Sequence, residues 1–261
     1  MEWGRTGRSR IGVCRRLAVA AAFLALLCTS GCGDGEPAAE SAASVSAPAG
    51  ASERRRLTAE LPGGTIDYTV VLPDGYTPGR PHPVLLALPP GGQGREEVDA
   101  LLDRVWEAEA RRRGWIVVSP EAPGGRLFFA GSEKLIPDFL DKVAALYPPE
   151  GGRFHLAGVS NGGLSAFSVA LATPKRFASL LGVPGYPQEG ARDADLGRLR
   201  GIPVTLFVGE NDSGWREAME DTHAELRRLG IRSTLRLSPG EGHIITKIPA
   251  ADYWDALDAA R

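Results

Sequence analysis

The chain has 261 residues, of which 43% are hydrophobic and 24% are charged. This balance is that of an ordinary globular protein, and the length allows one or two domains. The first 31 residues carry five Arg and one Glu, so removing their charge of +4 from the net charge of −2 leaves −6. A negative chain of this kind argues against nucleic acid as a partner and offers no basic patch for anionic lipid.

Residues 1–31 have the pattern of an export signal. Arginines make the start positive, and the apolar run Leu17–Leu27 follows. This run is shorter than the about 20 residues that span a bilayer, and it fits the core of a secretory signal. The pair Arg15-Arg16 leaves a twin-arginine signal open, although its flanking residues fit that motif poorly. We therefore expect the protein to be exported.

The signal ends in a stretch, Thr29 to Cys32, that resembles the lipobox of bacterial lipoproteins, with Thr29 where Leu is usual. Because no cysteine follows Cys32, that thiol has no disulfide partner after cleavage. We expect Cys32 to carry the acyl chains that hold the protein on a membrane, on its periplasmic or cell-surface side. The alternative is a soluble secreted protein. Residues 32–54 are rich in Ala, Ser, Gly and Pro and predict a flexible tether to a domain at 55–261.

Strand-like and helix-like patterns alternate along that domain. Short apolar runs flanked by loops predict the strands, and apolar residues at helical spacing predict the helices between them. Such alternation is typical of an α/β fold with a mostly parallel sheet covered by helices on both faces, whose ligand site lies beyond the carboxyl ends of the strands. The predicted strands are Thr65–Leu72, Val84–Leu88, Trp115–Val118, Phe154–Ala157, Leu180–Val183, Val204–Val208 and Ser233–Leu237, and the predicted helices run from near Val98 to Gly114, from Pro137 to Tyr147, over Leu164–Ala172, from Trp215 to Gly230 and over Ile248–Ala260.

A candidate nucleophile lies between one such strand and helix. The residues from Gly158 to Gly162 read Gly-Val-Ser-Asn-Gly, which matches G-x-S-x-G in the strand–turn–helix context that gives this motif its meaning. The turn must be so tight that side chains two residues either side of Ser160 would clash, which requires glycine there. The alternative is a glycine-rich turn with an incidental serine.

A serine hydroxyl needs a base to remove its proton, and histidine is the usual one. Of the four histidines, His82 approaches a strand, His155 lies inside one and His223 lies within a helix. Only His243 follows a strand end and comes after Ser160 in the chain. We therefore predict His243 as the base.

The acid that orients this imidazole is predicted to be Asp212, with Glu210 as the alternative. Both follow the strand Val204–Val208, and the order Ser, Asp, His then agrees with the order expected of a fold with this strand–turn–helix motif. Asp212 could instead cap the helix that begins near Gly214.

An oxyanion hole requires two backbone N–H groups. One is predicted from Asn161, next to the serine. The other must come from the loop after Val84–Leu88, where Pro89 and Pro90 have no N–H and leave Gly91 or Gly92.

These motifs together resemble the α/β-hydrolase superfamily over about residues 57–260. Within it the chain is similar to small secreted esterases related to feruloyl esterases and polyhydroxybutyrate depolymerases, and to the carboxylesterase/phospholipase group. The resemblance implies Ser160, Asp212 and His243 as the triad, with Gly91 and Asn161 as oxyanion donors. One departure is that Pro89-Pro90 replaces the His-Gly that often precedes the oxyanion glycines.

No segment is long enough for a large lid, so the site should be open to accessible esters. Phe128, Phe129 and Tyr186 are candidates for the walls of a substrate pocket, with core packing as the alternative. The leading hypothesis is a serine esterase that acts on a small or polymeric ester and needs neither a cofactor nor a metal ion. A serine peptidase or acyltransferase on the same triad is the second, and a non-catalytic surface-binding lipoprotein the third.

Overall fold

The computed structural model describes residues 54–188 and 196–261. The predicted signal at 1–31, the predicted acylation site Cys32 and the predicted tether up to residue 53 lie outside these ranges. Arg54, which the sequence assigns to the tether, is instead the first residue of a strand. No helix of the described residues combines the length and apolar character that a membrane crossing requires.

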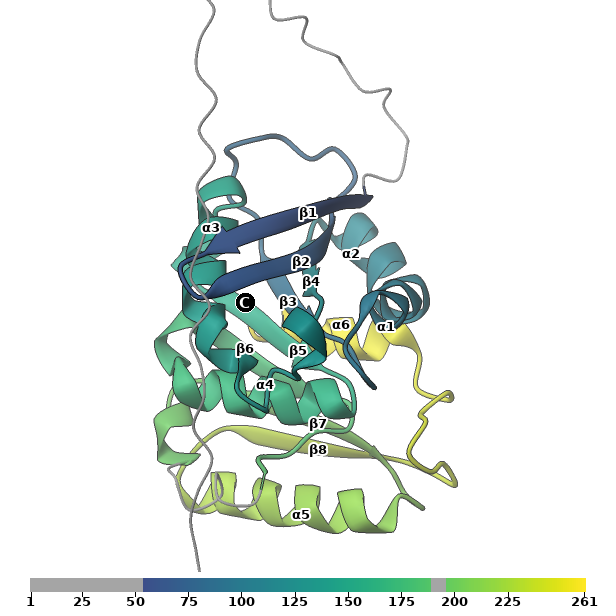
Figure 1. Cartoon of the computed structure of the whole chain (residues 1–261). Helices are drawn as coiled ribbons and strands as arrows, with labels where there is room; N and C mark the ends of the chain where they lie inside the picture. Colours follow the sequence, from purple (N-terminus) through teal and green to yellow (C-terminus); the bar gives the residue numbers. More distant parts are fainter. Residues whose placement is uncertain (1–53, 189–195) are drawn as a thin grey trace, which may run out of the picture. The chain divides into compact units, whose positions relative to one another are not determined.

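A sheet of eight strands in the order β1-β2-β4-β3-β5-β6-β7-β8 forms the centre of the described domain (Figure 1). The six strands from β4 to β8 in this order are parallel, and β2 runs antiparallel to both of its neighbours. The mostly parallel sheet predicted from the sequence is confirmed. The strands are β1 Arg54–Leu61, β2 Gly64–Val71, β3 Val84–Leu88, β4 Ile116–Pro120, β5 Phe154–Gly158, β6 Phe177–Gly182, β7 Val204–Gly209 and β8 Ser233–Ser238.

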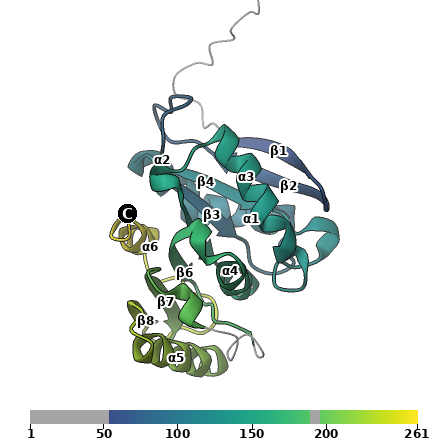
Figure 2. The same ribbon diagram turned by 90° about the vertical axis from the view of Figure 1, so that its left-hand side faces the viewer.

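Helices cover both faces of the sheet, with α3 and α4 on one side of it and α6 on the other in Figure 2. The segment from Arg95 to Arg113 is one continuous helix interrupted by a π-helical turn, and it ends at Gly114, whose φ of 80° closes the last turn. The helices are α1 Arg95–Leu101, the π-turn η1 Leu102–Trp106, α2 Glu107–Arg113, α3 Ile136–Leu146, α4 Asn161–Ala172, α5 Ser213–Arg228 and α6 Ala250–Asp258, with 3-10 turns at Pro123–Gly125, Ser132–Leu135, Glu150–Gly152, Pro174–Arg176 and Leu196–Leu199.

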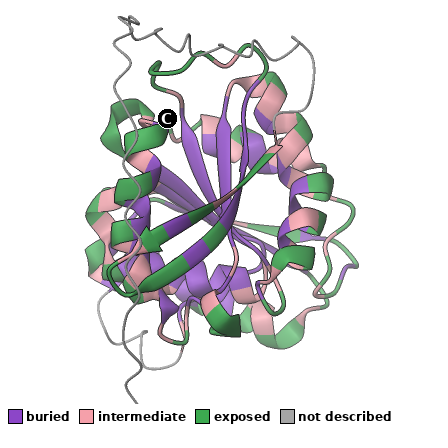
Figure 3. Cartoon of the chain, turned by 45° about the horizontal axis from the view of Figure 1, so that its top comes forward, coloured by how far each residue is buried: buried purple, intermediate pink, exposed green. Residues whose placement is uncertain are grey.

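The central strands are buried on both faces, which explains their continuous apolar sequences (Figure 3). Successive side chains of a strand point to opposite faces, so β3 and β5 each supply two cores. Leu86 and Leu156 belong to the core beneath α3, α4 and α5, whereas Leu85 and Ala157 belong to the core beneath α1, α2 and α6.

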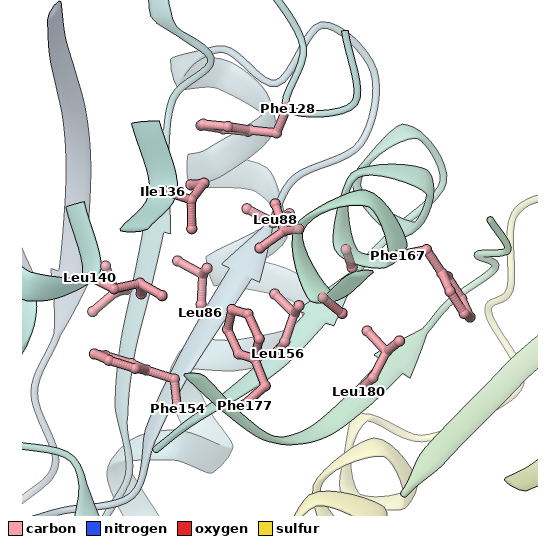
Figure 4. Packing of buried hydrophobic residues seen from close by; sticks show 14 of the residues in the cluster. Leu86, Leu88, Phe128, Ile136, Leu140, Phe154, Leu156, Phe167, Phe177 and Leu180 are labelled. Atoms are coloured by element: carbon pink, nitrogen blue, oxygen red, sulfur yellow. The ribbon is translucent and has the colours of Figure 1, made fainter. Parts of the chain in front are cut away.

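The first core is rich in phenylalanine and leucine, and Figure 4 shows its closely packed side chains. The second core is built around tryptophans. Trp254 lies edge-on to Trp106 and Trp115, with ring centroids 5.6 and 5.3 Å apart. Aromatic pairs in this geometry add to the stabilisation that burial provides. The two cores fix the sheet between its helices and make the strand ends a rigid platform.

Candidate active site

The chain reverses its direction of strand addition at β3. It adds β4 on one side of β3 and later returns to place β5 on the other side. A crevice forms at such a switch point, beyond the carboxyl ends of the two strands. Leu88 and Gly158 pair there as the last residues of β3 and β5. The loops that leave these two residues carry the predicted oxyanion glycines and Ser160.

Ser160 lies in a strained turn between β5 and α4. Its φ of 54° and ψ of −118° are rare for a residue with a side chain. The turn is held from both sides, since Val159 N–H donates to Leu88 O and Ser160 N–H donates to Pro184 O at 3.1 Å. This geometry raises the serine hydroxyl above the sheet, as the G-x-S-x-G motif predicts.

The two glycines that flank Ser160 are required by close backbone contacts. A Cβ at Gly158 would lie 1.9 Å from Gly162 O, and one at Gly162 would lie 2.1 Å from Leu88 O. Real Cβ atoms do not approach other atoms so closely, so an alanine at either position would force β5, α4 and β3 apart. The structure thus contains the clash that the sequence predicts on each side of the serine.

The three predicted triad side chains meet in one row. The Ser160 hydroxyl lies 2.8 Å from His243 Nε2, and His243 Nδ1 lies 2.8 Å from Asp212 Oδ2. The carboxylate side chain is only 12% exposed, while the imidazole is 38% exposed and therefore open to a ligand. Asp212 precedes the first residue of α5, but its side chain makes no capping hydrogen bond and faces the imidazole instead.

The loops that carry Asp212 and His243 leave neighbouring strands and are joined to each other. Asn211 N–H donates to Glu241 O at 2.7 Å, and Gly240 N–H donates to the Glu210 carboxylate at 2.8 Å. The alternative acid Glu210 therefore fixes the histidine loop rather than the imidazole. A Cβ at Gly209 would lie 2.0 Å from Gly242 O, so the two loops touch backbone to backbone.

Glu241 is a functional candidate that no motif in the sequence marks. Its carboxylate is buried, with a residue exposure of 6%, and it accepts hydrogen bonds from Ser238 Oγ, from the N–H and hydroxyl of Thr246 and from Lys247 N–H. Burial alone would raise the pKa of this carboxyl group, but these hydrogen bonds outweigh it and lower the pKa to about 2. Glu241 thus closes the loop on which His243 lies.

The loop after β3 distinguishes between the two candidate oxyanion glycines. Gly92 N–H already donates to Glu97 Oε1 at 3.3 Å, and Gly94 N–H donates to Glu97 Oε2. No backbone hydrogen bond between described residues uses the N–H of Gly91 or of Asn161. The Asn161 side-chain amide donates to Gly91 O at 2.9 Å and so orients that peptide. Gly91 is therefore the better-placed donor.

Gln93 anchors the same loop from inside the protein. It is fully buried with a φ of 56°, and its side-chain amide donates to Ser165 Oγ at 2.8 Å and to Pro89 O at 3.2 Å. Its carbonyl oxygen accepts from Phe128 N–H at 2.9 Å. One side chain therefore connects the oxyanion loop to α4 and to the segment after β4.

A cavity of about 720 Å³ opens beside Ser160 and His243. It lies between the helix that begins at Arg95 and the segment that leads from His243 into α6. Its walls are largely apolar, and burial raises the pKa of the Tyr253 phenol. Its lining includes Leu101, Arg104, Val105, Val159, Val183, Ile245, Ile248 and Tyr253.

None of the three predicted pocket-wall aromatics lines this cavity. Phe128 is completely buried among the core side chains (Figure 4), so the pocket prediction is wrong for this residue and core packing is correct. Phe129 is half-buried outside the cavity wall. The ring centroid of Tyr186 lies 4.9 Å from that of Trp215, which in turn lies 4.8 Å from that of His243. Tyr186 therefore contacts the imidazole only indirectly, through Trp215.

The remaining histidines have structural partners. His155 is buried against Trp115 and lies 2.8 Å from Ser179 Oγ, as expected of a core residue. His223 contacts Ser233 Oγ, and His82 contacts Gly114 O. Within residues 54–188 and 196–261, no group of three or more His, Cys, Asp or Glu could hold a metal ion.

Comparison with known proteins establishes the fold. No family profile and no curated protein sequence matches the chain. Among solved structures, a thermostable esterase is 17% identical with a TM-score of 0.63, covering 79% of this chain and 62% of that one. A ferulic acid esterase is 18% identical with a TM-score of 0.60, covering 79% of this chain and 94% of that one. A fluorophosphonate-binding serine hydrolase of Staphylococcus aureus is 17% identical with a TM-score of 0.61, covering 81% of this chain and 98% of that one. The chain has the α/β-hydrolase fold, as predicted.

Proposed function

We propose that this α/β-hydrolase-fold chain is a serine esterase that cleaves carboxylic esters through an acyl-enzyme. The observation that carries the proposal is the row formed by Ser160, His243 and Asp212, with both of its hydrogen bonds at 2.8 Å. A nucleophile, its base and an acid that orients the base are the parts that acyl transfer requires. The esterases and serine hydrolases among its structural neighbours support this assignment.

In the proposed mechanism, Ser160 Oγ attacks the ester carbonyl while His243 Nε2 takes the hydroxyl proton. The carbonyl oxygen becomes an oxyanion that Gly91 N–H and Asn161 N–H stabilise. The intermediate collapses, the C–O bond to the alcohol breaks, and His243 gives its proton to the leaving alkoxide. Water then attacks the acyl-enzyme with His243 again as base, which releases the acid and restores Ser160. Asp212 holds the imidazole tautomer and stabilises its positive charge.

We further propose that the enzyme acts outside the cytoplasm and is anchored through acylated Cys32, a part of the proposal that rests on the sequence of residues 1–54 alone. An open cavity of about 720 Å³ suits an ester group that is accessible on a small molecule or at the surface of a polymer.

The function is tested with the Ser160→Ala variant. We expect the wild type to hydrolyse short 4-nitrophenyl esters and to react covalently with a fluorophosphonate probe, and the variant to do neither. The variant removes the nucleophile without changing the backbone, and circular dichroism controls for its folding. Hydrolysis at the wild-type rate by Ser160→Ala would refute the proposal. Probe labelling without turnover of any ester would favour a peptidase or an acyltransferase.

The acid is tested by comparing two neighbouring carboxylates. Asp212→Asn should lower kcat by roughly 10³- to 10⁴-fold, because the amide favours the wrong imidazole tautomer. Glu210→Gln is the matched control, since Glu210 contacts Gly240 N–H rather than the imidazole. We expect it to keep kcat within about tenfold of the wild type. The opposite ranking of the two variants in steady-state kinetics would make Glu210 the acid.

A further inference from the structure

Most of the side chains that line the cavity beside Ser160 are apolar. Among the described residues, its lining also includes the acidic Glu96 and Glu97 and one arginine, Arg104. Arg104 lies in the π-helical turn Leu102–Trp106, a type of helix irregularity that is frequent at functional sites.

Arg104 has no partner among the described residues. No carboxylate or carbonyl oxygen of residues 54–188 and 196–261 accepts a hydrogen bond from its guanidinium or forms an ion pair with it. Other arginines of the same continuous helix differ in this respect, since Arg111 pairs with Asp74 and Arg113 with Glu109 and Asp258. Arg104 is therefore an exposed arginine in the wall of a substrate-sized cavity, and no described residue pairs with its guanidinium.

The charged side chains are distributed unevenly along the cavity, with the carboxylates near Ser160 and the arginine farther away. Glu97 holds the oxyanion loop through Gly92 and Gly94, so the first turn of α1 lies at the catalytic end. Arg104 follows Glu96 by eight residues, which places it roughly 10–12 Å further along the helix axis. The two carboxylates disfavour an anionic group near the nucleophile, and the guanidinium favours one at the distant end.

We propose that the enzyme prefers esters whose apolar acyl chain carries a carboxylate at its far end, and that Arg104 binds this carboxylate. The inference rests on the proposed function, because it assigns the substrate class of the same site. Apolar walls such as Leu101, Val105 and Ile248 would contact the chain, while Ser160 attacks the ester at the other end. The planar guanidinium can donate two parallel hydrogen bonds to a carboxylate.

The test uses 4-nitrophenyl half-esters of glutaric, adipic and suberic acid, each compared with the same ester whose remote carboxylate is methylated. We expect the wild type to show a kcat/KM about five- to tenfold higher for the best charged ester than for its neutral counterpart at low salt, with the difference mainly in KM. Because Arg104 is exposed, the preference should shrink as salt is added.

Arg104→Gln should abolish this preference, mainly by raising KM for the charged esters, and Arg104→Glu should reverse it. Arg95→Gln is the matched control, because Arg95 lies on the same helix but outside the cavity wall and near Glu121. It should keep the preference.

An equal ratio of charged to neutral kcat/KM in the wild type and Arg104→Gln would overturn the inference while the esterase assignment stands. Equal effects of Arg95→Gln and Arg104→Gln would show that the preference arises from general surface charge, and this would also overturn the inference. A stronger preference for an ester that ends in phosphate would contradict the carboxylate assignment. If the wild type hydrolyses no ester, charged or neutral, the proposed function itself falls and the inference falls with it.

Discussion

Glu241 is the residue whose environment says most about how the proposed site keeps its shape. A carboxylate of this kind would be costly to bury if its oxygens lacked hydrogen-bond donors. Ser238, Thr246 and Lys247 supply those donors from both sides of His243 in the chain. The imidazole therefore lies on a loop that is closed at its base, which limits how far its Nε2 can move from Ser160.

Glu241→Ala should lower kcat by about 10²-fold with little change in KM, because a shift of the imidazole by about 1 Å costs that much in rate. Glu241→Gln keeps most of the hydrogen-bonding shape and should recover most of the rate. The measurement is steady-state kinetics on a neutral ester, with thermal unfolding as a check on folding. A wild-type kcat in Glu241→Ala would show that this carboxylate does not position His243.

Among the elements, the loop between β3 and α1 depends most on a single interior side chain. The Gln93 side chain connects this loop to α4 through Ser165 and to the segment after β4 through Phe128 N–H, and its backbone carbonyl accepts from Ala122 N–H. Since Pro89 and Pro90 lack N–H groups, the loop has few backbone hydrogen bonds of its own. The position of Gly91 therefore depends on Gln93.

Gln93→Leu should lower the free energy of unfolding by about 3 kcal/mol, because it leaves buried polar groups such as Phe128 N–H without partners. The rate should also fall at least tenfold as Gly91 shifts. Ser165→Ala is the control that removes only one partner, and we expect a loss of about 1 kcal/mol from it. Urea denaturation with parallel kinetics measures both quantities, and a Gln93→Leu variant as stable as the wild type would contradict this account.

For the whole molecule, the buried His155 makes stability depend on pH. Burial lowers its pKa to about 4, and the charges of Arg261 and Arg153 act in the same direction. An unfolded histidine has a pKa of about 6.5. Between these values the unfolded chain binds a proton that the folded chain does not. The contribution of His155 to stability is therefore fully present above pH 6.5 and is lost as the pH falls toward 4.

We expect this single group to remove about 3 kcal/mol of stability between pH 7 and pH 4. The His155→Gln variant should show a flatter dependence over this range, although it is less stable at pH 7. Glu241 begins to lose its contribution only below its ordinary pKa of 4.5, so the two groups titrate in largely separate ranges. Denaturant titrations at several pH values measure the slope, and equal slopes for both proteins would rule out His155 as its source.

Much of the fold could be predicted from the sequence because the central strands are buried on both faces and appear as short apolar runs. β1 was missed because it is an exposed edge strand in which only Ala59 is buried, so no apolar alternation marks it. The π-turn was missed because a wider turn does not change the apolar composition of a helix.

The arrangement of Ser160, Asp212 and His243 could be predicted because parallel strands bring the loops at their carboxyl ends together. The direction in which the cavity extends could not be predicted, because it depends on the side of these loops on which the helix that begins at Arg95 lies. Phe128 follows a strand end as the triad residues do, yet its ring turns inward to the core. Position in the chain selects the rim of the sheet but not the orientation of each side chain.

The π-turn at Leu102–Trp106 accommodates one residue more than a regular α-helical turn between the two halves of its helix. The half before it carries Glu97 to the oxyanion loop, and the half after it carries Arg113 to α6. Deleting one residue from this turn should restore regular α-helical winding and move Arg104 in the cavity wall, while the two halves keep their orientation. Such a deletion should therefore reshape the cavity and leave both attachments of the helix in place.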